Sequence, residues 1–439
     1  MQNNILTISF SGDVLLSQRI PAAGYEGREE LKQLLQTHEC NIANLETTVH
    51  RSEGYPESFP GGGYAMADPL CLKDLKDMGF NFFSAANNHA MDYGHGGLLA
   101  TMKYLKDYEL PYAGIGANLS EASRPAYFET SAGRVALLGI TSSFHDSYAE
   151  GHQNKDLQGR PSVAPLKHKA IYELSGEHFD ALQEIAHATG INSYHNRAVK
   201  SGYLVASDNF KFGSYEFKRG RENKVNTYPN PQDLQRTLNA IDDAKFKSDF
   251  VVISIHSHQI KGENRWLSPD FITDFSKKCI EQGADVVICH GPHVMRGVEI
   301  YQNGVIFHGL GNLILQHEAA DVLPEDFYQK YGENSHSVSG VAGIYNKRSK
   351  NATIGLATQP DVWKTIIVSL TRDETKTAYK IHPIEVQLKG KKGMQGLPKL
   401  SKDPSILKHL QELSSELGTQ IHIADNIGTI TIPLNNSSH

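Results

Sequence analysis

The sequence predicts an α/β layered fold, and three observations support this class. Short apolar runs recur along the chain, and each is followed by a polar cluster and then by a stretch with helical periodicity. The runs have the length and the Val, Ile and Phe content of strands. The stretches between them carry helix start and stop signals. In α/β folds, ligands bind beyond the carboxyl ends of the strands, so the polar clusters are the first place to look for a site.

The expected strands follow one another with helices between them. Strands are expected at residues 5–10, 40–44, 80–86, 250–255, 284–289 and 304–307. Residues 68–79 predict a helix because they begin with Asp-Pro and end at a glycine, and residues 268–283 begin with Ser-Pro and also end at a glycine. Residues 96–110 predict a third helix, since their apolar side chains recur on one helical face.

Two regions depart from this rhythm. Residues 145–250 are polar and loop-rich around a predicted helix at 176–190, which indicates an insertion or lid within a domain spanning residues 1–345. Residues 346–439 are expected to complete the same domain. Two β-rich runs within 362–388 surround a charged turn and predict an antiparallel pair. Residues 401–418 predict a helix, with Asp403 as its cap and Pro404 in its first turn.

Composition excludes several classes of protein. The chain has 439 residues, 39% hydrophobic and 21% charged, with a formal net charge of −6, which argues against coating of nucleic acid or an anionic membrane. The four cysteines lie far apart without a CxxC motif, so buried free thiols are expected. The first apolar run is too short for a signal peptide, and no run reaches the length of a membrane span. A cytoplasmic protein is therefore expected from the sequence as written.

Six residues at or after the predicted strand ends carry metal-ligating atoms: Asp13, Glu46, Asn88, His256, His290 and His293. Three imidazoles, two carboxylates and an amide oxygen suit Mn, Zn, Fe or Mg and do not suit a thiolate-preferring site. Six ligands exceed the four of a structural zinc and fit two divalent ions that share a carboxylate. Each residue alone has a simpler explanation as a helix cap or a turn residue. Six ligand-type residues at successive strand ends together favour a metal site.

The segment AANNHAMDYG, residues 85–94, adds two catalytic candidates. His89 follows Asn88 and would be an imidazole that does not bind metal and faces the reacting group. Asp92 lies three residues further on and can orient His89 if the chain turns there. The alternative is a solvated polar turn, since Asn and Asp favour turns.

At these residues the sequence resembles the CapA family, named for bacterial poly-γ-glutamate capsule synthesis and similar to calcineurin-like metallophosphoesterases. The resemblance rests on SGDVLL, NIANLETTV, AANNHAMDYGHGGLLAT, VVISIHSH and GADVVICHGPHVMRGVEIYQNGVIFHGLGN. It implies a four-layer α/β/β/α sandwich of the metallo-dependent phosphatase type, with an insertion and a C-terminal β-rich and helical extension. It also implies one or two divalent ions held by the six residues above, with Glu46 as the bridging carboxylate and His89 as the catalytic histidine.

The sequence departs from the phosphoesterase pattern in three places. Leu15 stands where those enzymes carry a metal-binding histidine, Glu46 is longer than the usual bridging aspartate, and His258 adds an imidazole near His256 outside the expected ligand set. The missing histidine implies that one metal is held more weakly than the other.

The resemblance implies a role in poly-γ-glutamate or capsule polymer metabolism, with metal-dependent hydrolysis of a phosphoester or amide-type bond. Two alternatives stay open: a metal-independent peptide epimerase or isomerase that uses the site histidines, and a non-catalytic polymer assembly or export factor. The expected partner is an anionic polymer or peptide substrate. Neither nucleic acid nor a membrane span is expected for this chain.

Overall fold

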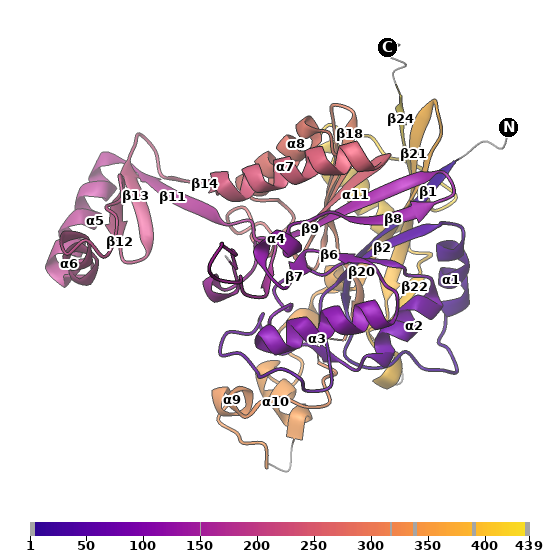
Figure 1. Ribbon diagram of the computed structural model, residues 1–439, viewed down its shortest axis with the longest axis horizontal. Coiled ribbons are helices and arrows are strands. Elements are labelled where there is room, and N and C mark those ends of the chain that lie inside the picture. Colours follow the sequence, from indigo (N-terminus) through magenta and orange to yellow (C-terminus); the bar gives the residue numbers. More distant parts are fainter. Residues whose placement is uncertain (1–4, 150, 317, 337–339, 389–391, 435–439) are drawn as a thin grey trace.

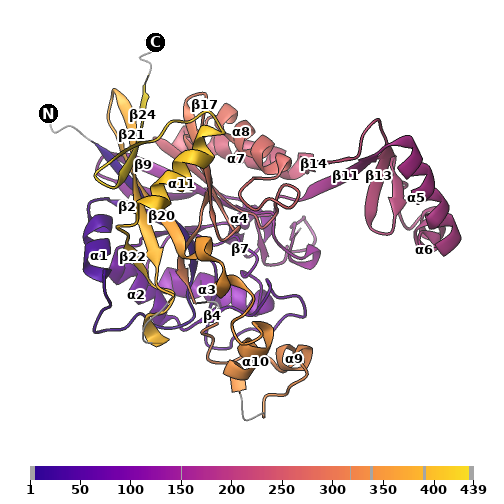
Figure 2. The ribbon, with the colours of Figure 1, turned by 180° about the vertical axis from the view of Figure 1, so that it is seen from behind.

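A computed structural model of the protein describes residues 5–149, 151–316, 318–336, 340–388 and 392–434. It has a broad body built around two β-sheets, and a smaller lobe that projects from one side of the body (Figures 1 and 2). Helices and strands alternate over much of the body. The mixed α/β class predicted from the sequence is confirmed.

The larger sheet of the body has ten strands. Their order is β23 (His422–Ala424), β24 (Ile427–Pro433), β21 (Lys376–Val386), β20 (Lys364–Arg372), β1 (Leu6–Leu15), β2 (Cys40–Leu45), β5 (Phe82–Ser84) and β6 (Tyr112–Ala113), with β19 (Asn312–Leu315) paired to β1 and β22 (Pro398–Leu400) paired to β21. The six-stranded sheet has the order β17 (Met295–Tyr301), β18 (Gly304–Leu310), β16 (Val286–His290), β15 (Phe250–His256), β9 (Gly133–Thr141) and β8 (Ala126–Thr130).

Two short strand pairs lie outside these sheets, namely β3 (Thr48–Val49) with β4 (Met66–Ala67) and β7 (Ile115–Gly116) with β10 (Ser162–Val163). The described helices are α1 (Arg28–Gln36), α2 (Leu70–Met78), α3 (Gly94–Asp107), α4 (Leu119–Ala122), α5 (Gly176–Thr189), α6 (Ser193–Lys200), α7 (Pro231–Lys247), α8 (Asp270–Gln282), α9 (Glu325–Lys330), α10 (Gly340–Arg348) and α11 (Pro404–Ser415). Single 3₁₀ turns occur at Asp146–Tyr148, Leu356–Thr358, Pro360–Trp363 and Lys392–Met394.

The main apolar core is formed by strands of both sheets. Successive residues of a strand point to opposite faces, so every second residue of β1 can enter this core. Its members from the two sheets include Ile8 and Phe10 of β1, Val135 of β9, Val252 of β15 and Phe307 of β18. All five are essentially excluded from solvent. Burial of this apolar surface holds the two sheets together.

Helices cover the remaining faces of the two sheets. Leu31 of α1, Leu75 of α2 and Leu105 of α3 share a buried cluster with Leu45 and Phe83 of the larger sheet. A separate cluster joins α7 and α8 to the smaller sheet, through residues that include Ile241, Phe271, Phe275, Ile253 and Val287. The helices at 68–79, 96–110 and 268–283 predicted from sequence correspond to α2, α3 and α8.

The C-terminal residues add strands to the larger sheet. β20 pairs antiparallel with β1, with Leu6 opposite Arg372 and Phe10 opposite Val368. β20 and β21 form the antiparallel pair expected from sequence. The helix expected at 401–418 is α11, and Asp403 caps it because its Oδ1 accepts a hydrogen bond from the Ser405 amide at 2.9 Å.

The projecting lobe is formed by residues 168–229. Its sheet has the order β12 (Phe210–Phe212), β13 (Tyr215–Arg219), β11 (His168–Leu174) and β14 (Lys224–Pro229), and α5 and α6 complete it. β11 and β14 pair antiparallel and form the stem that joins the lobe to the body (Figures 1 and 2). The lobe occupies the middle of the expected 145–250 insertion, whereas α7, at the end of that range, packs on the body.

Two further expectations concern cysteines and membranes. All four cysteines are buried and free, as expected from their spacing. Within the described ranges, no helix combines the length and the apolar character needed to cross a bilayer.

Candidate metal centre

Strand ends from both sheets meet at one place in the body. Asp13 lies near the end of β1 and Glu46 directly follows β2, and these two strands run parallel. His256 ends β15 and His290 ends β16, and these residues face each other in a parallel register. Because the carboxyl ends of parallel strands lie at the same edge of a sheet, each sheet contributes ligand-type side chains to this edge.

Asp13 is completely buried and is surrounded by donors. Its Oδ1 accepts a hydrogen bond from Asn44 Nδ2 at 2.8 Å, and its Oδ2 accepts one from the Gly291 amide at 3.1 Å. The Nδ1 atoms of His290 and His256 lie 3.4 and 3.7 Å from Oδ1. Burial opposes ionisation of this carboxyl, but the contact with His290 and the nearby imidazoles together hold the pKa of Asp13 below its ordinary value.

Glu46 is equally buried but lacks such donors. Neither of its carboxylate oxygens has a hydrogen-bond partner among the described residues. The Nε2 atoms of His256 and His258 lie 3.6 and 3.8 Å from Oε1. Burial, followed by repulsion from Asp13 and Asp92, raises the pKa of Glu46 well above its usual range. A cation bound to Glu46 would favour its ionised form and so lower this pKa.

The histidines of the cluster lie close to one another. The ring centroids of His256 and His258 are 4.9 Å apart, and those of His258 and His293 are 5.1 Å apart. Burial lowers the pKa of His256 to about 3, against the opposing effect of Asp13. Burial and then His256 also hold the pKa of His258 well below its ordinary value. Neutral imidazole is the form that binds metal ions.

His293 is held by its backbone and by Asn312. Its φ of 57° lies in the left-handed region that side chains other than glycine seldom adopt, and such residues cluster at functional sites. The Nδ1 atom of His293 is 2.8 Å from Asn312 Oδ1. Asn312 is itself held in place, because its Nδ2 donates a hydrogen bond to the Val362 carbonyl at 3.0 Å. The turn and this contact fix the direction of the ring.

There are two sets of three side chains, and in each set three ligand atoms, one from each side chain, lie within 4.8 Å of one another. One set is Glu46, His256 and His258, and the other is Asp13, Glu46 and His293. Both contain Glu46, the residue expected to bridge two ions. Among the predicted ligands and His258, the buried atoms without a hydrogen-bond partner in the described part of the chain are Glu46 Oε1 and Oε2, Asn88 Oδ1, His256 Nε2, His258 Nε2 and His290 Nδ1. This donor set fits a borderline or hard divalent ion.

Asn88, His89 and Asp92 lie on a turn after β5, against a run of three glycines. Asn88 Nδ2 donates to the Gly61 carbonyl at 2.7 Å, which leaves Oδ1 as the free amide oxygen. Gly61 is required there, because a Cβ atom would lie 2.6 Å from the Asn88 carbonyl oxygen. The backbone therefore presents Asn88 in one orientation.

His89 is oriented by Asp92. Its Nδ1 lies 2.6 Å from Asp92 Oδ2, and this carboxylate also accepts hydrogen bonds from the amides of Ala65 at 2.7 Å and Gly61 at 2.8 Å. Asp92 is thus fully partnered, and Nε2 is the ring nitrogen of His89 that remains available. A cavity of about 80 Å³ borders Asn88, His89 and His293.

The structure brings the sequence-predicted residues together and adds others. His258 is part of one of the two ligand groups although it was outside the expected set. Its signal was the two-residue spacing from His256, since alternate residues of an extended chain point to the same side. Leu15, at the histidine position of the phosphoesterase pattern, is buried and borders the same cavity. The Gly61–Gly63 run gave no signal, because a glycine run usually indicates a solvated loop.

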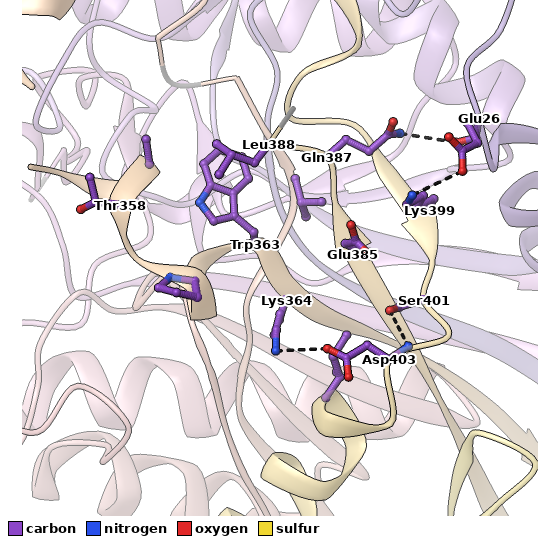
Figure 3. A pocket seen from close by; sticks show the side chains of 14 residues that line it. Glu26, Thr358, Trp363, Lys364, Glu385, Gln387, Leu388, Lys399, Ser401 and Asp403 are labelled. Carbon is purple, nitrogen blue, oxygen red and sulfur yellow. Dashed lines mark hydrogen bonds and ion pairs between the residues drawn. The ribbon is translucent and has the colours of Figure 1, made fainter. Parts of the chain in front are cut away.

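A second, larger cavity of about 740 Å³ lies elsewhere, between the 3₁₀ turns before β20 and the strands β21 and β22 (Figure 3). Four of its charged side chains form two ion pairs, with Lys364 3.2 Å from Asp403 and Lys399 3.4 Å from Glu26. Among the described residues, none of the candidate metal ligands borders it. The smaller cavity is the one that adjoins the histidine–carboxylate cluster, through His293.

The fold and this cluster define a mixed α/β protein with a buried histidine–carboxylate site at the meeting strand ends of two sheets. A sequence model of the family described as "Bacterial capsule synthesis protein PGA_cap" matches residues 7–317, and the chain belongs to this family. The resemblance to CapA proteins noted from the motifs is confirmed.

Individual relatives are more distant. The chain is 28% identical over 435 residues to the uncharacterized protein y4sH of Sinorhizobium fredii, which covers 96% of this chain and 92% of that protein. It is 25% identical over 244 residues to the capsule biosynthesis protein CapA of Bacillus anthracis, covering 55% of this chain and 42% of that protein. It is 22% identical over 318 residues to the PGA biosynthesis protein CapA of Bacillus subtilis, covering 71% of this chain and 64% of that protein.

Proposed function

We propose that this protein is a metal-dependent hydrolase of the metallophosphatase type that acts on a phosphoester or amide-type bond in capsule polymer metabolism. The family supports the polymer context, since two relatives carry names for capsule and PGA biosynthesis. We further propose that the sheets and their covering helices correspond to the four-layer α/β/β/α sandwich of metallophosphatases.

One observation carries the proposal, namely the cluster of buried ligand atoms without partners around Glu46. An unsatisfied buried polar group destabilises a fold by about 1–3 kcal/mol, and more when it is charged. A buried carboxylate beside three imidazoles is therefore difficult to explain by stability alone. One or two divalent ions would satisfy these atoms, and we assign Asp13, Glu46, Asn88, His256, His290 and His293, with His258 added, as the residues that hold them.

A bound divalent ion supplies an activated water and polarises the oxygen of the bond to be broken. The chain itself supplies His89, whose imidazole is held by Asp92 with Nε2 available at the cavity. In this position His89 can hand a proton to the leaving group or take one from substrate. Leu15, which is buried, forms an apolar part of the cavity wall.

The test compares metal content and turnover in protein purified without chelators. We expect the native protein to hold one or two equivalents of Mn, Zn, Fe or Mg, and to cleave model phosphoesters or γ-glutamyl amides only when loaded. Glu46→Gln should lose metal and activity together. Glu385→Gln, on the exposed side of β21 and away from the site, is the matched control and should retain both.

Other outcomes would contradict the proposal. Turnover of a peptide epimer by metal-free native protein would favour the isomerase alternative. A metal-free protein without any turnover, which still supports polymer assembly, would favour the assembly factor.

A further inference from the structure

Arg348 borders the cavity beside the candidate metal centre. It is the last residue of α10, is half-buried, and lines the cavity of about 80 Å³ together with Asn88, His89 and His293. Its guanidinium lies against the glycine run, because a Cβ atom on Gly63 would be 3.3 Å from Arg348 Nη1. α10 lies beyond residues 7–317, so the family match does not include this arginine.

Among the described residues, no carboxylate is paired with the Arg348 guanidinium. Within the described residues, Arg348 makes no ion pair or hydrogen bond, whereas its neighbour Lys347 pairs with Glu333. Tyr345 lines the same cavity as Arg348. Burial is the main cause that raises the pKa of the Tyr345 hydroxyl to about 12, so this group is neutral near pH 7 and offers no charge to the guanidinium. The Asp92 carboxylate accepts a hydrogen bond from Gly61 of the same glycine run, and it is already engaged by His89 and by the amides of Ala65 and Gly61. The donors of Arg348 are therefore available to a ligand.

A position in the last turn of a helix could also explain a cation, because the helix dipole favours positive charge there. That role requires only charge and no particular geometry. It does not account for a guanidinium that borders a cavity shared with His89. A lysine at the same position would preserve the dipole effect and lose the planar fork, so the two explanations can be separated.

The chemistry of the cavity suits a compact anion. A guanidinium presents its donors in a planar fork that matches two oxygens of a phosphate or carboxylate. A volume of about 80 Å³ corresponds to roughly two or three water molecules, which suits one such group and excludes a whole polymer unit.

We propose that Arg348 is a specificity-determining residue that binds an anionic phosphate or carboxylate group of the substrate beside His89. This inference rests on the proposed function, because it places the anion next to the groups assigned to hydrolysis. It narrows the substrate class to molecules with an anionic group adjacent to the bond that reacts.

The test measures binding of two small anions to protein as purified, with its metal content determined in parallel. Inorganic phosphate represents the phosphoester and glutarate represents a γ-glutamyl carboxylate, and calorimetry gives a dissociation constant for each. We expect the native protein to bind one of them, and the preferred anion identifies the source. Arg348→Gln should weaken that binding about 10- to 100-fold, as expected for loss of a charge-assisted hydrogen bond. Arg348→Lys should give an intermediate loss.

The matched control is Lys350→Gln, because Lys350 is an exposed cation two residues away that does not border the cavity. It should bind the anion as the native protein does. Three outcomes would each overturn the inference. The Arg348→Gln variant could bind the anion as tightly as the native protein does, or it could lose its metal. The native protein could also show no saturable binding of either anion. Arginine-dependent anion binding without hydrolysis would leave the inference intact and refute the proposed function. Metal-dependent hydrolysis with an unchanged KM in Arg348→Gln would support the proposed function and refute the inference about Arg348.

Discussion

Glu46 and His256 illustrate how burial prepares a site for a cation. Without an ion, burial favours a neutral carboxyl on Glu46 and a neutral imidazole on His256, so the pair does not form a stable salt bridge. The 3.6 Å separation of their nearest atoms is longer than a hydrogen bond. A buried polar group without a hydrogen-bond partner calls for an explanation, and a bound cation would supply one for Glu46.

His89 allows a test of catalysis apart from metal binding. Its Nδ1 is engaged by Asp92, so we place it as an acid or base and not as a ligand. His89→Ala should lower turnover by about 10²–10⁴-fold with metal content unchanged. His95→Ala, on an exposed position of α3, is the control and should have native turnover. Loss of metal in His89→Ala, measured by elemental analysis, would show instead that His89 is a ligand.

His382 links pH to stability away from the site. Burial lowers its pKa from 6.5 to about 4, and its Nε2 lies 3.0 Å from Ser369 Oγ. The unfolded chain takes up this proton near pH 6.5 but the folded chain only near pH 4. The stabilisation from neutral His382 is therefore complete above pH 6.5 and is lost as the pH falls from 6.5 towards 4.

We expect the native protein to lose about 2 kcal/mol more unfolding free energy than His382→Gln between pH 7 and pH 4.5. Urea unfolding at the two pH values measures the difference. His422→Gln, on the exposed side of β23, should behave like the native protein. The same loss in His382→Gln as in the native protein would assign acid sensitivity to other groups.

At the scale of elements, α11 shows a cap that was predictable from sequence and can be tested. Asp403 Oδ1 accepts the Ser405 amide, and Oδ2 lies 3.2 Å from Lys364 Nζ. Loss of an N-cap side chain destabilises a protein by about 1 kcal/mol. Asp403→Ala should lower the unfolding free energy by about that amount, whereas Asp403→Asn keeps the cap and removes only the exposed ion pair. Chemical denaturation would compare them, and equal losses in both variants would assign the effect to the ion pair.

Elements with strong local signals were the predictable part of the fold. α2 and α8 end at Gly79 and Gly283, whose φ values of 115° and 110° require glycine, and this requirement is visible in the sequence. The strand-end residues were predictable for a similar reason, since a polar ligand directly after an apolar run is a local pattern. Their assignment to metal binding and catalysis stays a prediction.

Features set by contacts distant in sequence were not predictable. Arg348 borders the cavity beside His89 across more than half of the chain, and no local pattern connects the two residues. The lobe strands β11 and β14 pair across α5 and α6, so their polar, half-exposed sequences resemble loops until the partner strand is known.

At the scale of the whole molecule, the antiparallel strands β11 and β14 connect the lobe to the body, so the lobe can be removed without changing the candidate metal ligands. β11 and β14 run side by side, with His168 opposite Pro229 and Ile171 opposite Asn226. The root of this stem packs on the body, because the ring of His168 stacks on Phe271 of α8 at a centroid distance of 4.2 Å. None of the candidate metal ligands comes from the lobe, which is residues 168–229.

This arrangement predicts the result of removing the lobe. Residues 172–225 can be replaced by Asn-Gly, which favours the tight turn that joins two antiparallel strands, so that Ile171 and Asn226 become the last pair of a hairpin. We expect the shortened protein to fold, because the root of the stem and both body sheets are retained. Its free energy of unfolding should lie within about 1 kcal/mol of that of the native protein, and its metal content should be the same. Cleavage of small model substrates should persist at the native rate. Loss of metal on shortening, measured by elemental analysis, would show that the lobe supports the site and is not an independent attachment.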